Sequence, residues 1–201
     1  MKIVEIKSKK LDSYLKGLRR STSLSDPKLE SATKKIVDDV KKNGNKALFK
    51  YTKRFDKVDL NNGTVKVTAR EIEHAQKHVS SKIKANLRTA ARRVREFHKH
   101  KMPKGSVYKD SLGNELGWLI RPIERAGLYV PGGKAAYPST VLMTAIPAKV
   151  AGVQELVLVT PCPHGELNPT VLVAASIAGV DSIYKVGGAQ AVRSWSYQRD
   201  V

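Results

Sequence analysis

The second half of the chain alternates short apolar runs with turns and longer apolar segments. The runs occupy residues 127–130, 156–160 and 183–186. A turn containing Gly or Pro follows each run, and a segment with helix-like apolar content follows the turn. This repeat of strand, turn and helix is typical of βαβ units and predicts a parallel sheet. Such sheets bind ligands at the carboxyl ends of their strands.

The first half has the apolar spacing of amphipathic helices. Apolar residues recur at helical intervals after Pro27, and the turn Asn43-Gly44-Asn45 is expected to end that helix before a second one begins. Thr68 and Glu71 have the T-x-x-E spacing of a capping box, which predicts a short third helix. The clearest apolar stripe predicts a long fourth helix with a basic opposite face. The members of the stripe are Ile83, Leu87, Ala90, Val94 and Phe97.

Residues 107–123 read as a hairpin around Leu112-Gly113-Asn114, which leads into the apolar second half. The change of pattern near Pro122 predicts a boundary there, with a helical segment over residues 1–122 and a second unit over residues 123–201. We therefore expect an α/β fold, in which an N-terminal helical segment is followed by a Rossmann-like parallel-sheet domain.

Charge is distributed very unevenly. Lys and Arg exceed Asp and Glu by 19 in the whole chain, and residues 1–110 hold 18 of that excess. A net charge of this size attracts polyanions, so a basic nucleic-acid-binding module is one alternative function. The basic residues are interleaved along helices, however, and do not form one run. A lysine-rich solvated surface is the favoured interpretation, and nucleic acid is not the expected partner.

Compartment signals in the sequence are consistent with the cytoplasm. No apolar run approaches the ~20 residues that span a bilayer, and the N-terminus lacks an apolar signal core. The lone cysteine, Cys162, excludes an internal disulfide framework and suits a reducing environment. We expect a cytoplasmic protein with no membrane partner.

Two loops at the predicted carboxyl edge carry the candidate binding residues. Tyr129 is followed closely by Gly132 and Gly133, and the third run is followed by Gly188 and Gln190. Glycines let the backbone approach a ligand, helix N-termini attract anions, and a glutamine amide can donate to or accept from a ribose or an amide. Because no G-x-G-x-x-G fingerprint is present, a plain βα turn and a helix-capping glutamine remain the alternatives.

Two histidine and cysteine spacings have a geometry that metal or nucleophile sites use. His74 and His78 lie four residues apart, and Cys162 and His164 flank a proline. Neither pair has a third ligand nearby in sequence, so surface histidines and a structural cysteine are the favoured interpretation of both. No catalytic residue and no metal ligand is assigned from these patterns.

Several sequence motifs of the chain resemble those of the histidinol dehydrogenase family. The strings are GLYVPGG, AAYPSTVLM, IPAKVAGV and VGGAQA, together with IVDDVKKNGNKALFKYTKRFDKVDL in the first half. The resemblance covers residues 26–192. It implies NAD-dependent, two-step oxidation of L-histidinol to L-histidine with a bound zinc, in a dimeric enzyme of histidine biosynthesis. It also implies that Tyr129 and Gln190 contact NAD.

The same resemblance implies that much of the family's sequence is not in this chain. Family members continue into a second half that carries a Glu–His base pair, the zinc ligands and a GPGN loop that helps to hold NAD. Residues 1–122 would then belong to a discontinuous α/β domain, and residues 123–201 to an incomplete, NAD-associated one. We expect weak or absent NAD binding and no activity of the chain alone. A non-catalytic subunit or remnant that pairs with a separate C-terminal chain is the alternative.

Overall fold

The computed structural model describes residue 11, residues 13–15, residues 26–132 and residues 137–197. A three-stranded parallel sheet lies at the centre, with strand order β3-β4-β5. Its strands are β3 (Arg125–Tyr129), β4 (Glu155–Val159) and β5 (Ser182–Tyr184). The predicted runs therefore identified all three strands, with their starts placed one or two residues late.

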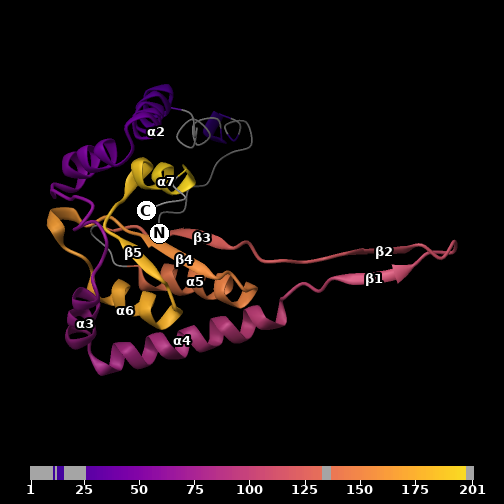
Figure 1. Ribbon diagram of the computed structural model, residues 1–201. Coiled ribbons are helices and arrows are strands. Elements are labelled where there is room, and N and C mark those ends of the chain that lie inside the picture. The colour runs from indigo at the N-terminus through magenta and orange to yellow at the C-terminus, as the bar shows by residue number, and fades with distance from the viewer. Residues whose placement is uncertain (1–10, 12, 16–25, 133–136, 198–201) are drawn as a thin grey trace.

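Helices cover both faces of this sheet (Figure 1). The crossovers α5 (Pro138–Ala151) and α6 (Pro169–Ala178) lie on one face, with α3 (Ala69–His78) and α4 (Ser81–His100) packed behind them. On the other face lies α7 (Gly188–Tyr197), against which α2 (Pro27–Asp56) packs. A short 3-10 turn, η1 (Pro163–Gly165), follows β4. The arrangement confirms the predicted α/β class with its N-terminal helices and Rossmann-like sheet.

Two apolar clusters hold these layers together. Leu156 and Leu158 of β4 point into the larger cluster, which joins the sheet to α3, α4, α5 and α6. Val159 faces the smaller cluster, together with Leu48 of α2 and Ala191 of α7. The period of two along a strand explains this alternation between faces. The larger cluster contains residues from both sides of Pro122, and the domain division at that point stays a prediction.

Local sequence signals explain the helix ends. Thr68 and Glu71 form the predicted capping box, in which the Thr68 hydroxyl accepts from the Glu71 amide at 3.2 Å and the Glu71 carboxylate accepts from the Thr68 amide at 2.7 Å. Gly44 interrupts α2 with non-helical angles (φ 54, ψ −134), as the Asn-Gly-Asn turn predicted. Glycine suits this place because residues with a Cβ rarely adopt positive φ.

The apolar stripe of α4 differs in part from the prediction. Leu87 is buried as expected, but Ala90 is exposed and Ala91 takes its place in the core. Ile83 and Phe97, at the two ends of the stripe, are 42% and 58% exposed. Only the middle of α4 therefore meets α5 and α6, and periodicity alone does not reveal where that contact ends.

A hairpin of β1 (Ser106–Lys109) and β2 (Glu115–Trp118) projects away from the body of the molecule (Figure 1). It forms the antiparallel pair predicted from the sequence, with Gly113 in its turn at φ 84. Among the described residues, no helix combines the length and the apolar content that crossing a membrane requires.

Candidate functional site

The carboxyl ends of the three strands meet at one edge of the sheet. Hydrogen bonds continue the ladder past the strands, from the Val130 amide to the Val159 carbonyl at 3.0 Å and from the Thr160 amide to the Tyr184 carbonyl at 3.1 Å. The loop after β3 and the loop after β5 are thereby held on either side of the loop after β4. This is the edge at which parallel sheets bind ligands.

Pro161, which follows β4, is the centre of this edge. A Cβ on Gly132 would lie 2.7 Å from the Pro161 carbonyl oxygen, and a Cβ on Gly187 would lie 2.5 Å from the Pro161 Cβ. Both distances are shorter than carbon and oxygen atoms tolerate, so each position requires glycine. At Gly132 and Gly187 the close neighbour that the absence of a Cβ admits is Pro161, and the approach of a ligand to Gly132 stays a prediction. Gly133 lies outside the described residues.

Tyr129, Gly188 and Gln190 come together above Pro161. The Gly188 amide donates to the Tyr129 hydroxyl at 3.3 Å, which links the β3 loop to the first turn of α7. Gly188 has φ 65, and a Cβ there would lie 2.6 Å from Gln190 Oε1. The three residues chosen from sequence are therefore neighbours in space, with Tyr129 at the end of β3 and Gly188 and Gln190 in the first turn of α7.

The side chain of Gln190 is the most unusual feature of the edge. It is 1% exposed, and its Oε1 has no hydrogen-bond partner among the described residues. Leaving a buried carbonyl oxygen unpaired costs about 1–3 kcal/mol, so such atoms are rare unless a ligand or a partner satisfies them. Tyr129, by contrast, is 39% exposed, which leaves its ring accessible at the surface.

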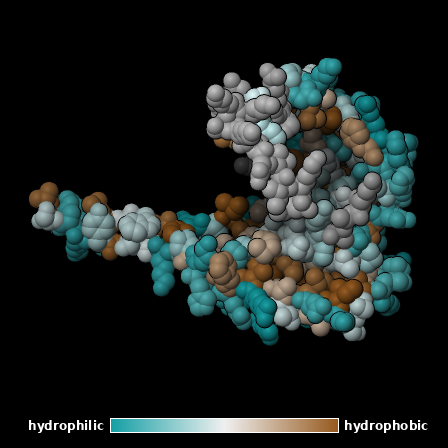
Figure 2. Space-filling model, turned by 180° about the vertical axis from the view of Figure 1, so that it is seen from behind, coloured by the Kyte–Doolittle hydropathy of each residue, from teal (hydrophilic) through white to brown (hydrophobic). Residues whose placement is uncertain are grey.

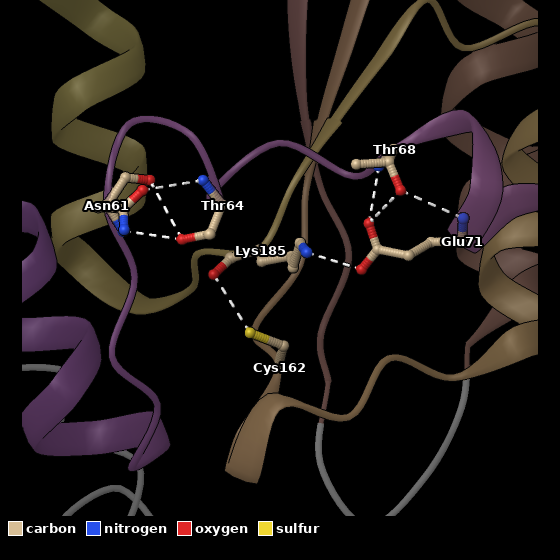
Figure 3. Close-up of polar contacts among 6 residues, drawn as sticks. All are labelled: Asn61, Thr64, Thr68, Glu71, Cys162 and Lys185. Atoms are coloured by element: carbon tan, nitrogen blue, oxygen red, sulfur yellow. Dashed lines mark hydrogen bonds and ion pairs between the residues drawn. The ribbon is translucent and has the colours of Figure 1, made fainter.

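A polar network fixes the end of β5 that precedes this loop (Figure 3). Lys185 Nζ makes a 2.6 Å ion pair with Glu71 Oε1, and the Lys185 amide donates to the Val65 carbonyl at 2.9 Å. Burial alone would raise the pKa of Glu71, but Lys185 and the amide and hydroxyl of Thr68 outweigh it and lower that pKa below its ordinary value. The capping box of α3 is thereby joined to the segment after β5 that leads to Gly187 and Gly188.

Cys162 is a structural residue in this arrangement. It is fully buried, and its thiol donates to the Lys185 carbonyl at 3.4 Å (Figure 3). Burial, with a contribution from the Asp56 carboxylate, raises the pKa of the Cys162 thiol to about 11. A neutral buried thiol is a poor nucleophile and a poor metal ligand. His164 is exposed in η1, so the two residues do not form an accessible pair.

His74 and His78, the other pair with a metal-like spacing, contact each other within α3. The rings of His74 and His78 lie 3.9 Å apart, and Nδ1 of His78 is 2.8 Å from the His74 carbonyl oxygen, within the helix. Across the part of the chain that the structure describes, no group of three or more His, Cys, Asp or Glu residues is arranged to hold a metal ion.

Sequence reasoning missed the residues that support the site. Pro161 was not considered, although its position after a buried strand and before Cys162 marks a sheet edge. Lys185 and Glu71 were not paired, because they are 114 positions apart in the sequence and only the fold brings them together. The Y-V-P-G-G and V-G-G-A-Q strings themselves were the only signal that linked the two loops.

Comparison with known proteins identifies the family of this chain. The family model for histidinol dehydrogenase matches residues 18–200. The chain belongs to the histidinol dehydrogenase family. Histidinol dehydrogenase from Syntrophotalea carbinolica is 50% identical over 169 residues, which cover 84% of this chain and 39% of that relative. The one from Brucella abortus is 45% identical over 188 residues, which cover 94% and 43%.

A solved structure gives the same result. The crystal structure of histidinol dehydrogenase from Elizabethkingia anophelis superposes with a TM-score of 0.79 at 35% identity, covering 84% of this chain and 39% of that one. The chain thus spans about two-fifths of the length of the histidinol dehydrogenases that it matches. About three-fifths of the family's sequence has no counterpart within these 201 residues.

Proposed function

We propose that this chain forms the NAD-contacting part of a histidinol dehydrogenase. Tyr129 and Gln190 are the proposed contacts, and Gly132, Gly133 and Gly188 are the proposed backbone neighbours of the cofactor. The observation that carries the proposal is Gln190 Oε1, a buried acceptor without a partner among the described residues, beside the Tyr129–Gly188 link. It lies at the sheet edge where a dinucleotide is expected to bind.

The chemistry of this edge suits NAD. An unpaired amide oxygen requires a donor, and the ribose hydroxyls and carboxamide of NAD are donors. The helix α7 begins at Gly188, and the N-terminus of a helix favours an anion such as a pyrophosphate. Tyr129 offers an exposed aromatic ring and a hydroxyl. The residues present therefore fit the cofactor that the family uses.

Within the proposed reaction, this chain binds and orients. NAD, when bound, accepts the hydride that oxidation of L-histidinol to L-histidine releases in each of two steps. Tyr129 and Gln190 would fix the position of the cofactor, and the Glu71–Lys185 ion pair would hold the loop that carries Gln190. We infer that the base pair and the zinc ligands lie in the family's sequence outside these 201 residues.

The proposal extends to partners and location. L-Histidinol is the proposed substrate, and a homo-oligomer, or a complementing chain with the rest of the family's sequence, is the proposed assembly. The cytoplasm is the proposed compartment. Because the base and the zinc ligands are assigned elsewhere, the 201-residue chain is expected to be inactive alone, since the hydroxyl proton of the alcohol would have no acceptor.

An NADH assay tests this part of the proposal. The purified chain is mixed with L-histidinol, NAD and a zinc salt, and NADH absorbance is followed against a control without protein. We expect equal rates in the two. Turnover that disappears when Tyr129 or another residue of this chain is replaced would show that the chain is catalytically complete.

A further inference from the structure

The long helix α4 carries a row of basic residues along one side. Side chains three or four positions apart lie on the same side of a helix, one turn after another. Lys84 Nζ donates to the Gln76 carbonyl of α3 at 3.0 Å, which anchors the start of the row. With a rise of about 1.5 Å per residue, the row is roughly 22 Å long. We call its five members the basic row: Lys84, Arg88, Arg92, Arg95 and Lys99.

The basic row lies on the outside of the molecule. α4 packs on α5 and α6, on their side away from the sheet, and it ends before the β1–β2 hairpin, which projects as an arm (Figure 1). Leu87 and Ala91 are buried against these helices. Arg88, Arg92 and Lys99 are exposed, and the other two members of the row are half-buried. Figure 2 shows hydrophilic side chains along the lower rim of the molecule, where α4 lies.

No acidic side chain neutralises the basic row in the part of the chain that the structure describes. None of the five members forms an ion pair there. The only acidic residue of α4 is Glu96, and α5 and α6 contain none. In α3, Glu71 is paired with Lys185 and Glu73 with Lys77. The positive charge of the row therefore faces solvent without a partner among these helices.

The composition of the basic row determines which kind of polyanion fits it. A bilayer surface or an acidic protein is bound through buried apolar side chains as well as through charges. The row contains no apolar residue, and the exposed Ile83 and Phe97 of α4 fall outside its spacing. A phosphodiester backbone needs only cations, and the guanidinium group of arginine can bind two phosphate oxygens at once. Three of the five members are arginines, so the row suits a nucleic-acid backbone best.

We propose that the basic row of α4 binds the phosphodiester backbone of a nucleic acid without reading its base sequence. Duplex DNA carries one charge per about 1.7 Å of its axis, so a length equal to that of the row presents roughly 13 phosphates. Residues 1–110 hold an excess of 18 positive charges, and their field attracts the same polyanion from a distance. The row then fixes where on the surface the backbone lies.

The helical geometry of α4 changes the interpretation of the charge. In the sequence the basic residues are interleaved with others, which favours a solvated surface. In the structure the helical repeat gathers five of them on one side, and the neighbouring helices supply no carboxylate to pair with them. Backbone binding at this row uses neither Tyr129 nor Gln190, so it is independent of the proposed function.

Oligonucleotide binding by matched variants tests the row. The probes are a short fluorescent duplex DNA and a single-stranded RNA, each in two unrelated sequences, and Kd is measured by anisotropy between about 50 and 200 mM salt. Arg88→Gln with Arg92→Gln removes two charges from the row. Lys82→Gln with Arg93→Gln removes two charges from the same helix outside the row and is the control. All four side chains are exposed and glutamine is a good helix former, so both variants should keep the Tm of the wild type.

We expect the wild type and the control variant to bind with Kd values within a few-fold of each other and with no preference between unrelated sequences. The row variant should bind duplex DNA about ten-fold more weakly, and its plot of log K against log salt should be shallower by about 2, since each lost phosphate contact removes about 0.9. Arg88→Lys with Arg92→Lys keeps both charges and should retain most of the affinity. The probe that binds more tightly through the row identifies the form of nucleic acid.

Three results would overturn the proposal. One is no binding of either probe by the wild type at the lowest salt concentration. Another is an equal loss of affinity in the row variant and the control variant, because net charge alone would then account for the binding. The third is tighter binding to vesicles that contain phosphatidylserine than to either oligonucleotide, because the partner would then be a membrane surface.

Discussion

The packing of Gly187 against Pro161 gives a sharp quantitative test of the candidate site. In Gly187→Ala, the new Cβ would lie 2.5, 2.9 and 3.0 Å from the Cβ, Cγ and Cδ of Pro161. A proline ring cannot rotate away, so the backbone of one loop must shift. Overpacking of this kind costs about 1–3 kcal/mol. For a chain of this size, 1 kcal/mol corresponds to roughly 2–4 °C in Tm.

A double-mutant cycle isolates that contact. Thermal unfolding is measured for the wild type, Gly187→Ala, Pro161→Gly and the double variant. Because Pro161→Gly removes the ring and its Cβ, Gly187→Ala should cost much less in that background, with a coupling energy of at least about 0.5 kcal/mol. An unchanged Tm in Gly187→Ala, or the same loss in both backgrounds, would mean that the three loops do not meet at Pro161.

Three further predictions concern the buried groups beside the site. Cys162 is the only cysteine, and a pKa of about 11 leaves its thiolate fraction at pH 8 roughly 100-fold below that of an exposed thiol. An aromatic disulfide reagent should therefore react at least roughly 100-fold more slowly with the native chain than with the urea-unfolded chain. Native and unfolded rates within a few-fold of each other would contradict the burial of this thiol. Burial raises the pKa of Asp56 above its ordinary value, so ionisation of this carboxyl lowers the free energy of unfolding as the pH rises past that value. Asp56→Asn should increase the free energy of unfolding by roughly 1 kcal/mol at pH 7, measured with urea, and a decrease would contradict the destabilising burial of this carboxylate. The pKa of Glu71 is lowered, so the stability that its carboxylate contributes is present at neutral pH and is lost as the pH falls below the ordinary pKa of a glutamate. Glu71→Gln should cost about 0.5–2 kcal/mol at pH 7 and progressively less as the pH is lowered, whereas a cost that does not change with pH would argue against the ion pair with Lys185.

The parts of the fold that the sequence predicts well are those set by local chemistry. The capping box of Thr68 and Glu71 and the break at Gly44 depend on neighbours within a few residues, and both were found where predicted. The apolar run located β4 because that strand is buried on both faces. The exposure of Ala90 could not be foreseen, since it depends on the angle at which α4 crosses α5 and α6.

Some features of the candidate site could likewise be predicted from the sequence, and others could not. The pattern placed Tyr129 and Gln190 at a predicted sheet edge, and the family resemblance singled them out as NAD contacts. The burial of Gln190 and the unpaired state of its Oε1 could not be predicted, because they arise from the packing of α7 against the sheet. Cys162 and His164 are close in sequence, but the fold buries the first and exposes the second, which their spacing does not reveal.

Calorimetric titration of the chain with NAD tests the central claim most directly. Four proteins are compared: the wild type, Gln190→Met, Tyr129→Phe and Tyr108→Phe, the last of which changes an exposed tyrosine on the distant arm. Loss of one buried polar contact costs about 1–3 kcal/mol, or roughly 5- to 150-fold in Kd. We predict weak binding by the wild type and Tyr108→Phe and a loss of this size in Gln190→Met and Tyr129→Phe. Equal affinity in all four proteins would contradict the assignment of the NAD site.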